Sequence, residues 1–73
     1  MNYDEIEAIR NSLFMIREGF AKLLGIPLSA VYSWSRPGRS PRGAMLTFLK
    51  LLKTFPEETS SLLMRLQRGE GGG

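Results

Sequence analysis

Six basic side chains lie in the middle of the chain with no acidic residue among them. Residues 19–55 carry a charge of +6, which comes from these side chains: Lys22, Arg36, Arg39, Arg42, Lys50 and Lys53. Residues 1–18 sum to −2 and residues 56–73 to −1, which gives the net charge of +3. Such a block favours a polyanionic partner, of which nucleic acid is the commonest. The alternative is a basic surface that is simply solvated.

The composition excludes several kinds of catalytic and metal site. The 73 residues include no cysteine and no histidine, which rules out disulfides, Cys/His zinc sites and catalysis by Ser-His or Cys-His pairs. Capping of helix ends explains the carboxylates, so we expect no enzyme, no metal and no cofactor. No apolar run approaches the ~18–20 residues of a membrane span. Because the acidic N-terminus is also unlike a signal peptide, we expect a cytoplasmic protein.

Apolar residues repeat with helical spacing along most of the chain, and no stretch alternates as a strand does. The first expected helix has Ile6, Ile9 and Leu13 on one face and Asn2 as its N-cap. The second covers residues 17–24 and has its own apolar face. These patterns predict an all-α protein.

Three more helices are expected further along. The third has Pro27 in its first turn and is stopped by Pro37-Gly38. The fourth covers about residues 44–55, and its apolar stripe is so wide that we expect it to be covered on two sides. The fifth begins at Pro56 and turns three leucines inward, with Met64 off that face: Leu62, Leu63 and Leu66.

The second and third helices together have the layout of a helix-turn-helix. Gly25 suits the tight turn between them, and the small Ala21 lets the third helix pack closely across the second. We therefore predict a compact five-helix bundle over residues 1–68 that contains this motif, followed by a disordered Gly-rich tail, residues 69–73. Any helical hairpin with a glycine turn is the alternative.

Two segments resemble a known family. Residues 20–26, Phe-Ala-Lys-Leu-Leu-Gly-Ile, are similar to the "FAxLLGV" segment of Cro/CI-type (XRE) helix-turn-helix regulators. Val31, Trp34 and residues 39–43 resemble the "VxxWExGxRxPxG" run of HigA-like and MqsA-like antitoxins. The resemblance implies a lambda-repressor-like fold. The chain departs from the family pattern at Ile16-Arg17, where the family has Ser-Gln.

The resemblance also implies DNA binding, with the third helix, about residues 27–35, in the major groove. Helical spacing turns Val31 and Trp34 toward the core. The outward residues, with one arginine just past the helix, are expected to read bases: Ser29, Ala30, Tyr32, Ser33 and Arg36. Four residues are expected to contact phosphates: Arg17, Arg39, Ser40 and Arg42. For the two serines of the helix, an ordinary solvated face is the alternative, and for Arg36 the alternative is a phosphate contact.

A chain this small is expected to pair with a second copy, because its single core supplies only about 3–5 kcal/mol of net folding stability. A homodimer would also read two half-sites of an operator. Its expected interface comprises apolar residues from the fifth helix and the end of the fourth: Phe55, Leu62, Leu63, Met64 and Leu66. The alternative is that these leucines only close the monomer core.

The resulting hypothesis is a sequence-specific double-stranded DNA-binding transcriptional repressor that binds a palindromic operator as a homodimer. It would autoregulate a small operon of a phage or mobile element, like the anti-CRISPR-associated (Aca) regulators. One alternative is a HigA-like antitoxin that also binds a toxin, through the acidic first helix. Another is a protein-interaction module with the same fold and no DNA binding.

Overall fold

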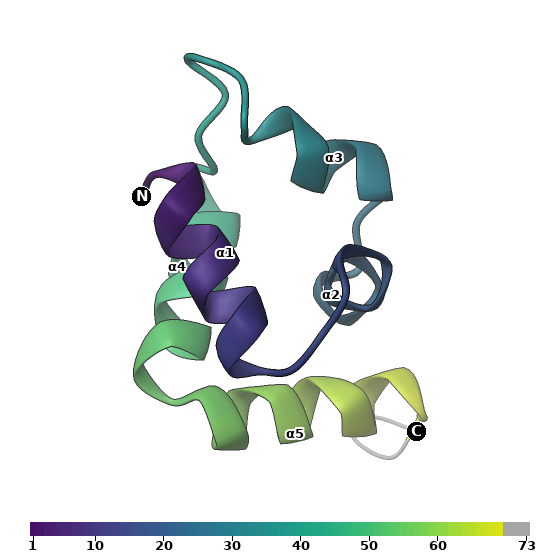
Figure 1. Cartoon of the computed structure of the whole chain (residues 1–73). Helices are drawn as coiled ribbons and strands as arrows, with labels where there is room; N and C mark the ends of the chain where they lie inside the picture. Colours follow the sequence, from purple (N-terminus) through teal and green to yellow (C-terminus); the bar gives the residue numbers. More distant parts are fainter. Residues whose placement is uncertain (70–73) are drawn as a thin grey trace.

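The computed structural model describes residues 1–69, which contain five α-helices and no strand (Figure 1). The helices are α1 (Tyr3–Ser12), α2 (Arg17–Leu24), α3 (Leu28–Ser33), α4 (Gly43–Thr54) and α5 (Pro56–Gln67). The predicted all-α fold with five helices is confirmed for this part of the chain. Residues 70–73, which make up most of the predicted tail, lie outside the described residues.

Helix α1 begins as the sequence predicts. The Asn2 side chain accepts a hydrogen bond from the Glu5 backbone N–H at 2.8 Å, which satisfies one of the free donors at the helix start. Asp4 and Glu5 in the first turn interact favourably with the positive end of the helix dipole. Ile6 and Ile9 are buried, so the predicted apolar face of α1 is confirmed.

Four helices build the core. Its buried side chains come from α1 to α4: Ile6, Ile9, Phe20, Ala21, Leu23, Val31, Leu49 and Leu52. Helix α5 lies across one end of the bundle, against α2 and α4, and contributes only the half-buried Leu63. The prediction that Leu62 and Leu66 face inward is wrong, because both are 58% exposed. A helix at the end of a bundle buries a narrower stripe than one packed between neighbours.

The expectation that α4 is covered on two sides is met only in part within residues 1–69, where α4 packs against α1 and α5. Leu49 and Leu52 are fully buried, whereas Phe48 and Leu51 are each 41% exposed. Part of the wide apolar stripe of α4 therefore stays open to solvent.

The turn between α2 and α3 has the predicted helix-turn-helix geometry. Gly25 has φ +73°, a left-handed conformation that glycine adopts without strain, and the Ile26 N–H donates to the Ala21 carbonyl at 3.0 Å. Ala21 is buried, in keeping with its predicted role at the close approach of the two helices. The sequence predicts Pro27 in the first turn of α3, whereas in the structure Pro27 is the N-cap, one position earlier.

Helix α3 is shorter than predicted and ends at Ser33. The Ser33 hydroxyl donates to the Ala30 carbonyl at 2.6 Å, and the Ser35 hydroxyl to the Tyr32 carbonyl at 2.7 Å. The next backbone N–H groups, up to that of Arg36, bond to carbonyls three residues back, which tightens the chain into turns. Serine hydroxyls that compete for backbone carbonyls explain the early end of the helix.

Candidate nucleic-acid interface

The outer face of α3 carries the residues that the sequence assigns to base readout. Val31 is buried and Trp34 packs against the core, which confirms the predicted inward face. Ser29 and Tyr32 are exposed on the opposite side, and Tyr32 is 47% exposed. The two remaining members of this face are partly buried: Ala30 and Ser33.

A shallow hollow of about 420 Å³ joins this face to the turn that follows α3. It is lined by Ser29, Tyr32, Ser33, Ser35 and Arg36. Four of the five predicted base-reading residues thus share one surface. Ser35 belongs to it as well but was missed, because its placement depends on the tight turns that end α3.

The hollow offers mainly hydroxyl groups and one cation. The hydroxyls of Ser33 and Ser35 already donate to backbone carbonyls, so both remain available as acceptors. Arg36 is exposed, and its guanidinium has the fork geometry that can bind guanine O6 and N7 or a phosphate. The surface therefore suits a partner with both donor and acceptor edges.

The segment between α3 and α4 holds the arginines on a fixed path. The Arg39 N–H donates to the Arg36 carbonyl at 3.2 Å, and Pro41 is buried against the body of the protein. Arg36, Arg39 and Arg42 are all exposed, as is Ser40. The buried proline, which no helical periodicity predicts, is the anchor of this basic segment.

One lysine of the basic block has an acidic partner. The Lys53 ammonium lies 3.4 Å from a carboxylate oxygen of Glu5, so this pair joins α4 to α1. Hydrogen bonding to Lys53, and then its charge, lowers the pKa of Glu5. Three of the five other cations of the block, Arg36, Arg39 and Arg42, lie in the segment after α3.

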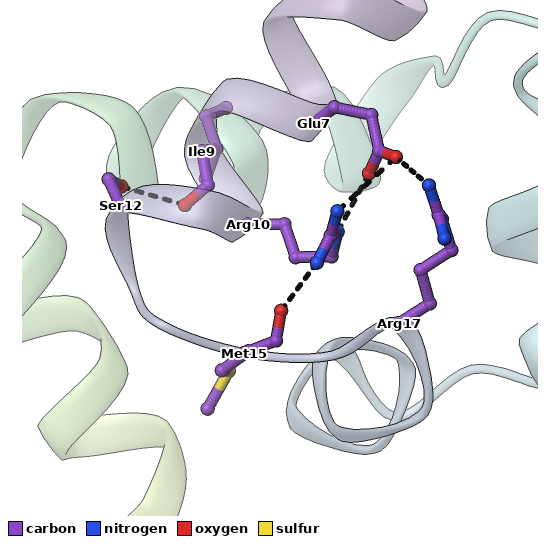
Figure 2. A network of polar contacts seen from close by, with 6 residues as sticks. All are labelled: Glu7, Ile9, Arg10, Ser12, Met15 and Arg17. Carbon is purple, nitrogen blue, oxygen red and sulfur yellow. Dashed lines mark hydrogen bonds and ion pairs between the residues drawn. The ribbon is translucent and has the colours of Figure 1, made fainter.

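Arg17 is engaged within the protein. Its guanidinium pairs with the Glu7 carboxylate of α1, and Figure 2 shows Arg10 and Arg17 meeting at this one carboxylate. Arg10 Nε donates to Glu7 at 2.8 Å, and Arg10 Nη1 donates to the Met15 carbonyl at 2.7 Å. Arg10 thereby ties the segment between α1 and α2 to α1.

These contacts affect the titration of both charged partners. Hydrogen bonding from Arg10, and to a lesser extent from Arg17, lowers the pKa of Glu7, although its burial acts in the opposite direction. Hydrogen bonding with Tyr3 and then Glu7 raises the pKa of Arg17. The contact of Arg17 with phosphate remains a prediction, and its guanidinium would have to serve both Glu7 and the nucleic acid.

Exposed apolar side chains gather on α4 and α5. They are Phe48, Leu51, Phe55, Leu62, Met64 and Leu66, and they include four of the five residues predicted at a dimer interface, with Phe55 at the junction of the two helices. Leu63, also predicted there, packs against the core instead. Phe48 and Leu51 were not predicted, although the width of the α4 stripe was a signal for them, and they line a hollow of about 390 Å³.

Within residues 1–69, no group of three or more acidic, histidine or cysteine side chains could hold a metal ion. None of the helices described there is both long and apolar enough to cross a membrane.

The chain is similar to the antitoxin HigA-2 of Vibrio cholerae serotype O1 (strain ATCC 39315 / El Tor Inaba N16961). The two are 36% identical over 59 residues, which cover 81% of this chain and 57% of the relative. The chain thus spans less than two thirds of that relative. No protein-family model and no solved structure matches it. The similarity agrees with the resemblance to HigA-like antitoxins, whereas the likeness to MqsA-like and Aca regulators remains a prediction.

Proposed function

We propose that this chain is a sequence-specific double-stranded DNA-binding regulator that represses transcription, with α3 in the major groove. One observation carries the proposal: the hollow on the outer face of α3 adjoins a basic segment held by the buried Pro41. Side chains in the hollow would face base edges while the neighbouring arginines contact the phosphates. The hydroxyls discriminate weakly between bases, so Arg36 would be the main direct reader of guanine.

Phosphate binding is assigned to Arg39, Ser40 and Arg42. They are exposed, and Arg42 is the N-cap of α4 but makes no side-chain capping hydrogen bond. The first backbone N–H groups of α4 therefore lie beside a guanidinium, which favours an anion at this point.

A homodimer would give the regulator useful specificity. One copy presents a short readout surface, whereas two copies related by two-fold symmetry would read half-sites about 34 Å apart, or a multiple of that, in an inverted repeat. The exposed apolar surface of α4 and α5 suits this pairing, because a second copy would remove it from water.

A second candidate function is that of an antitoxin that also binds a toxin. The similarity to an antitoxin favours this setting over a phage or mobile-element repressor. The acidic residues of α1 are weaker docking candidates than the sequence suggests, because Glu5 and Glu7 pair with basic side chains of this chain. Expression of the adjacent gene alone and together with this chain tests the candidate: rescue of growth by the chain supports it, and growth arrest in both cases contradicts it.

A mobility-shift series on the DNA upstream of the chain's own gene tests DNA binding. We expect the wild-type chain to shift this duplex at low salt. The double variant Arg39→Ala/Arg42→Ala should bind more weakly and lower the slope of log affinity against log salt by about 2, one for each lost phosphate contact. Thr54→Ala, at the far end of α4, is the control and should behave as wild type. Failure of the wild-type chain to bind any duplex at low salt would favour the protein-interaction module instead.

A further inference from the structure

Tyr32 is the largest side chain on the outer face of α3, and its ring lies against a cation from another helix. The guanidinium carbon of Arg17, the first residue of α2, lies 5.8 Å from the centroid of the Tyr32 ring. This distance allows a cation–π attraction, which favours one placement of the exposed ring.

Arg17 is itself held from behind. Its Nη2 donates to Glu7, whose side chain is only 17% exposed, and Glu7 is further fixed by Arg10. Arg10 also binds the carbonyl of Met15, two residues before Arg17, so the backbone that leads into Arg17 is tied to α1 as well. The guanidinium is thus a fixed bridge between Glu7 and Tyr32.

We propose that Arg17 is a positioning residue for Tyr32, and thereby for base preference, rather than a phosphate contact. The assignment rests on the proposed function, since it concerns the DNA surface of α3. The carboxylate that binds the guanidinium offsets its charge, so Arg17 adds little to the attraction for a polyanion. Its contribution is to hold the tyrosine ring at one place in the groove.

Selection from a library of duplexes with a random central segment separates the two roles. Arg17→Ala should change base preference at the same positions as Tyr32→Ala and leave the salt slope of binding unchanged. Arg39→Ala should lower that slope by about 1 and leave base preference unchanged. The proposal is overturned if Arg17→Ala lowers the slope by about 1 with wild-type base preference.

A conservative variant distinguishes positioning from a general effect on folding. Arg17→Lys keeps a cation that can lie over the ring and bind Glu7, so it should restore most of the wild-type preference that Arg17→Ala loses. Equal loss of preference in both variants, with both folded by circular dichroism, would contradict the assignment.

The contact can also be measured without DNA. Nuclear Overhauser effects between Arg17 side-chain protons and Tyr32 ring protons should be present in the wild-type chain and weaker in Glu7→Gln. They should be unchanged in the control Glu18→Gln, which removes the same charge from an exposed residue of α2. Their absence from the wild-type chain overturns the positioning role even where DNA binding is intact. A wild-type chain that has the contact but binds no duplex overturns the proposed function, and with it the role in base preference.

Discussion

Gln67, in the last turn of α5, donates from Nε2 to the backbone carbonyl of Leu23 at 2.9 Å. The same amide also donates to the carbonyl of Lys22. Both carbonyls belong to the final turn of α2, and that of Lys22 also accepts a hydrogen bond from the Gly25 backbone N–H at 3.1 Å. One side chain of α5 thus completes the end of the first helix of the helix-turn-helix.

We expect Gln67→Ala to lower the free energy of unfolding by about 0.5–1.5 kcal/mol, since it removes the side-chain partner of these carbonyls. Urea denaturation of the variant measures the change. Ser61→Ala, an exposed position on the same helix, is the control and should stay within about 0.5 kcal/mol of wild type. Equal stability of Gln67→Ala and the wild-type chain would mean that solvent replaces the amide at no cost.

Phe14 follows α1 in the left-handed conformation that Gly25 adopts after α2. Its φ is +57°, and the next N–H, that of Met15, bonds to the Arg10 carbonyl five residues back, as Ile26 does to Ala21. The ring is 97% exposed and so gains little from packing. A side chain other than glycine or asparagine is strained at such a position.

Phe14→Gly is therefore expected to raise the free energy of unfolding by about 0.5–1 kcal/mol, because relief of strain exceeds the extra backbone entropy of glycine. Phe14→Ala keeps the strain and loses only an exposed ring, so it should remain near wild type. Thermal and urea unfolding compare the three chains. A Phe14→Gly variant that is less stable than the wild-type chain would contradict the inferred backbone strain at Phe14.

The Glu7 network predicts a loss of stability in acid. The pKa of Glu7 is lowered in the folded chain by its hydrogen bonds to Arg10 and Arg17, whereas a glutamate in the unfolded chain has a pKa of about 4.3. A lowered folded-state pKa stabilises the fold above the unfolded value, and this stabilisation is lost as pH falls below about 4.3 through the folded-state value.

Glu7→Gln should consequently be less stable than wild type at neutral pH, with the difference shrinking as pH falls below about 4.3. Urea unfolding across this pH range measures it. Glu18→Gln, which removes an exposed carboxylate of α2 outside this network, is the matched control. If Glu7→Gln and wild type differ in free energy of unfolding by the same amount at every pH, the pairing of charges is not the cause of that difference.

Substitution of the exposed leucines of α5 is expected to weaken self-association. Leu62→Ser/Leu66→Ser should raise the dimer dissociation constant by about tenfold or more, since each buried leucine contributes roughly 1.5–3 kcal/mol. Sedimentation equilibrium measures the constant, and circular dichroism verifies the fold. Ile16→Ser, an equally exposed apolar site outside α4 and α5, is the control. A wild-type chain that sediments as a monomer at high concentration would contradict the proposed interface.

The sequence by itself determined the helices and the motif, because these depend on local chemistry. Apolar spacing located the α1 and α2 faces, Asn2 located the start of α1, and Gly25 located the tight turn. A cap, a left-handed glycine and a helical period each act within a few residues, so they can be identified without the rest of the fold.

Only the tertiary structure decided which groups meet across helices. The pairing of Arg17 with Glu7 and Tyr32, the burial of Pro41 and the exposure of Leu62 all depend on how the helices pack against one another. Period and composition specify which face of a helix is apolar but not the neighbour that covers it. For that reason the sequence could assign Arg17 to a phosphate, whereas the folded chain gives its guanidinium a carboxylate and an aromatic ring.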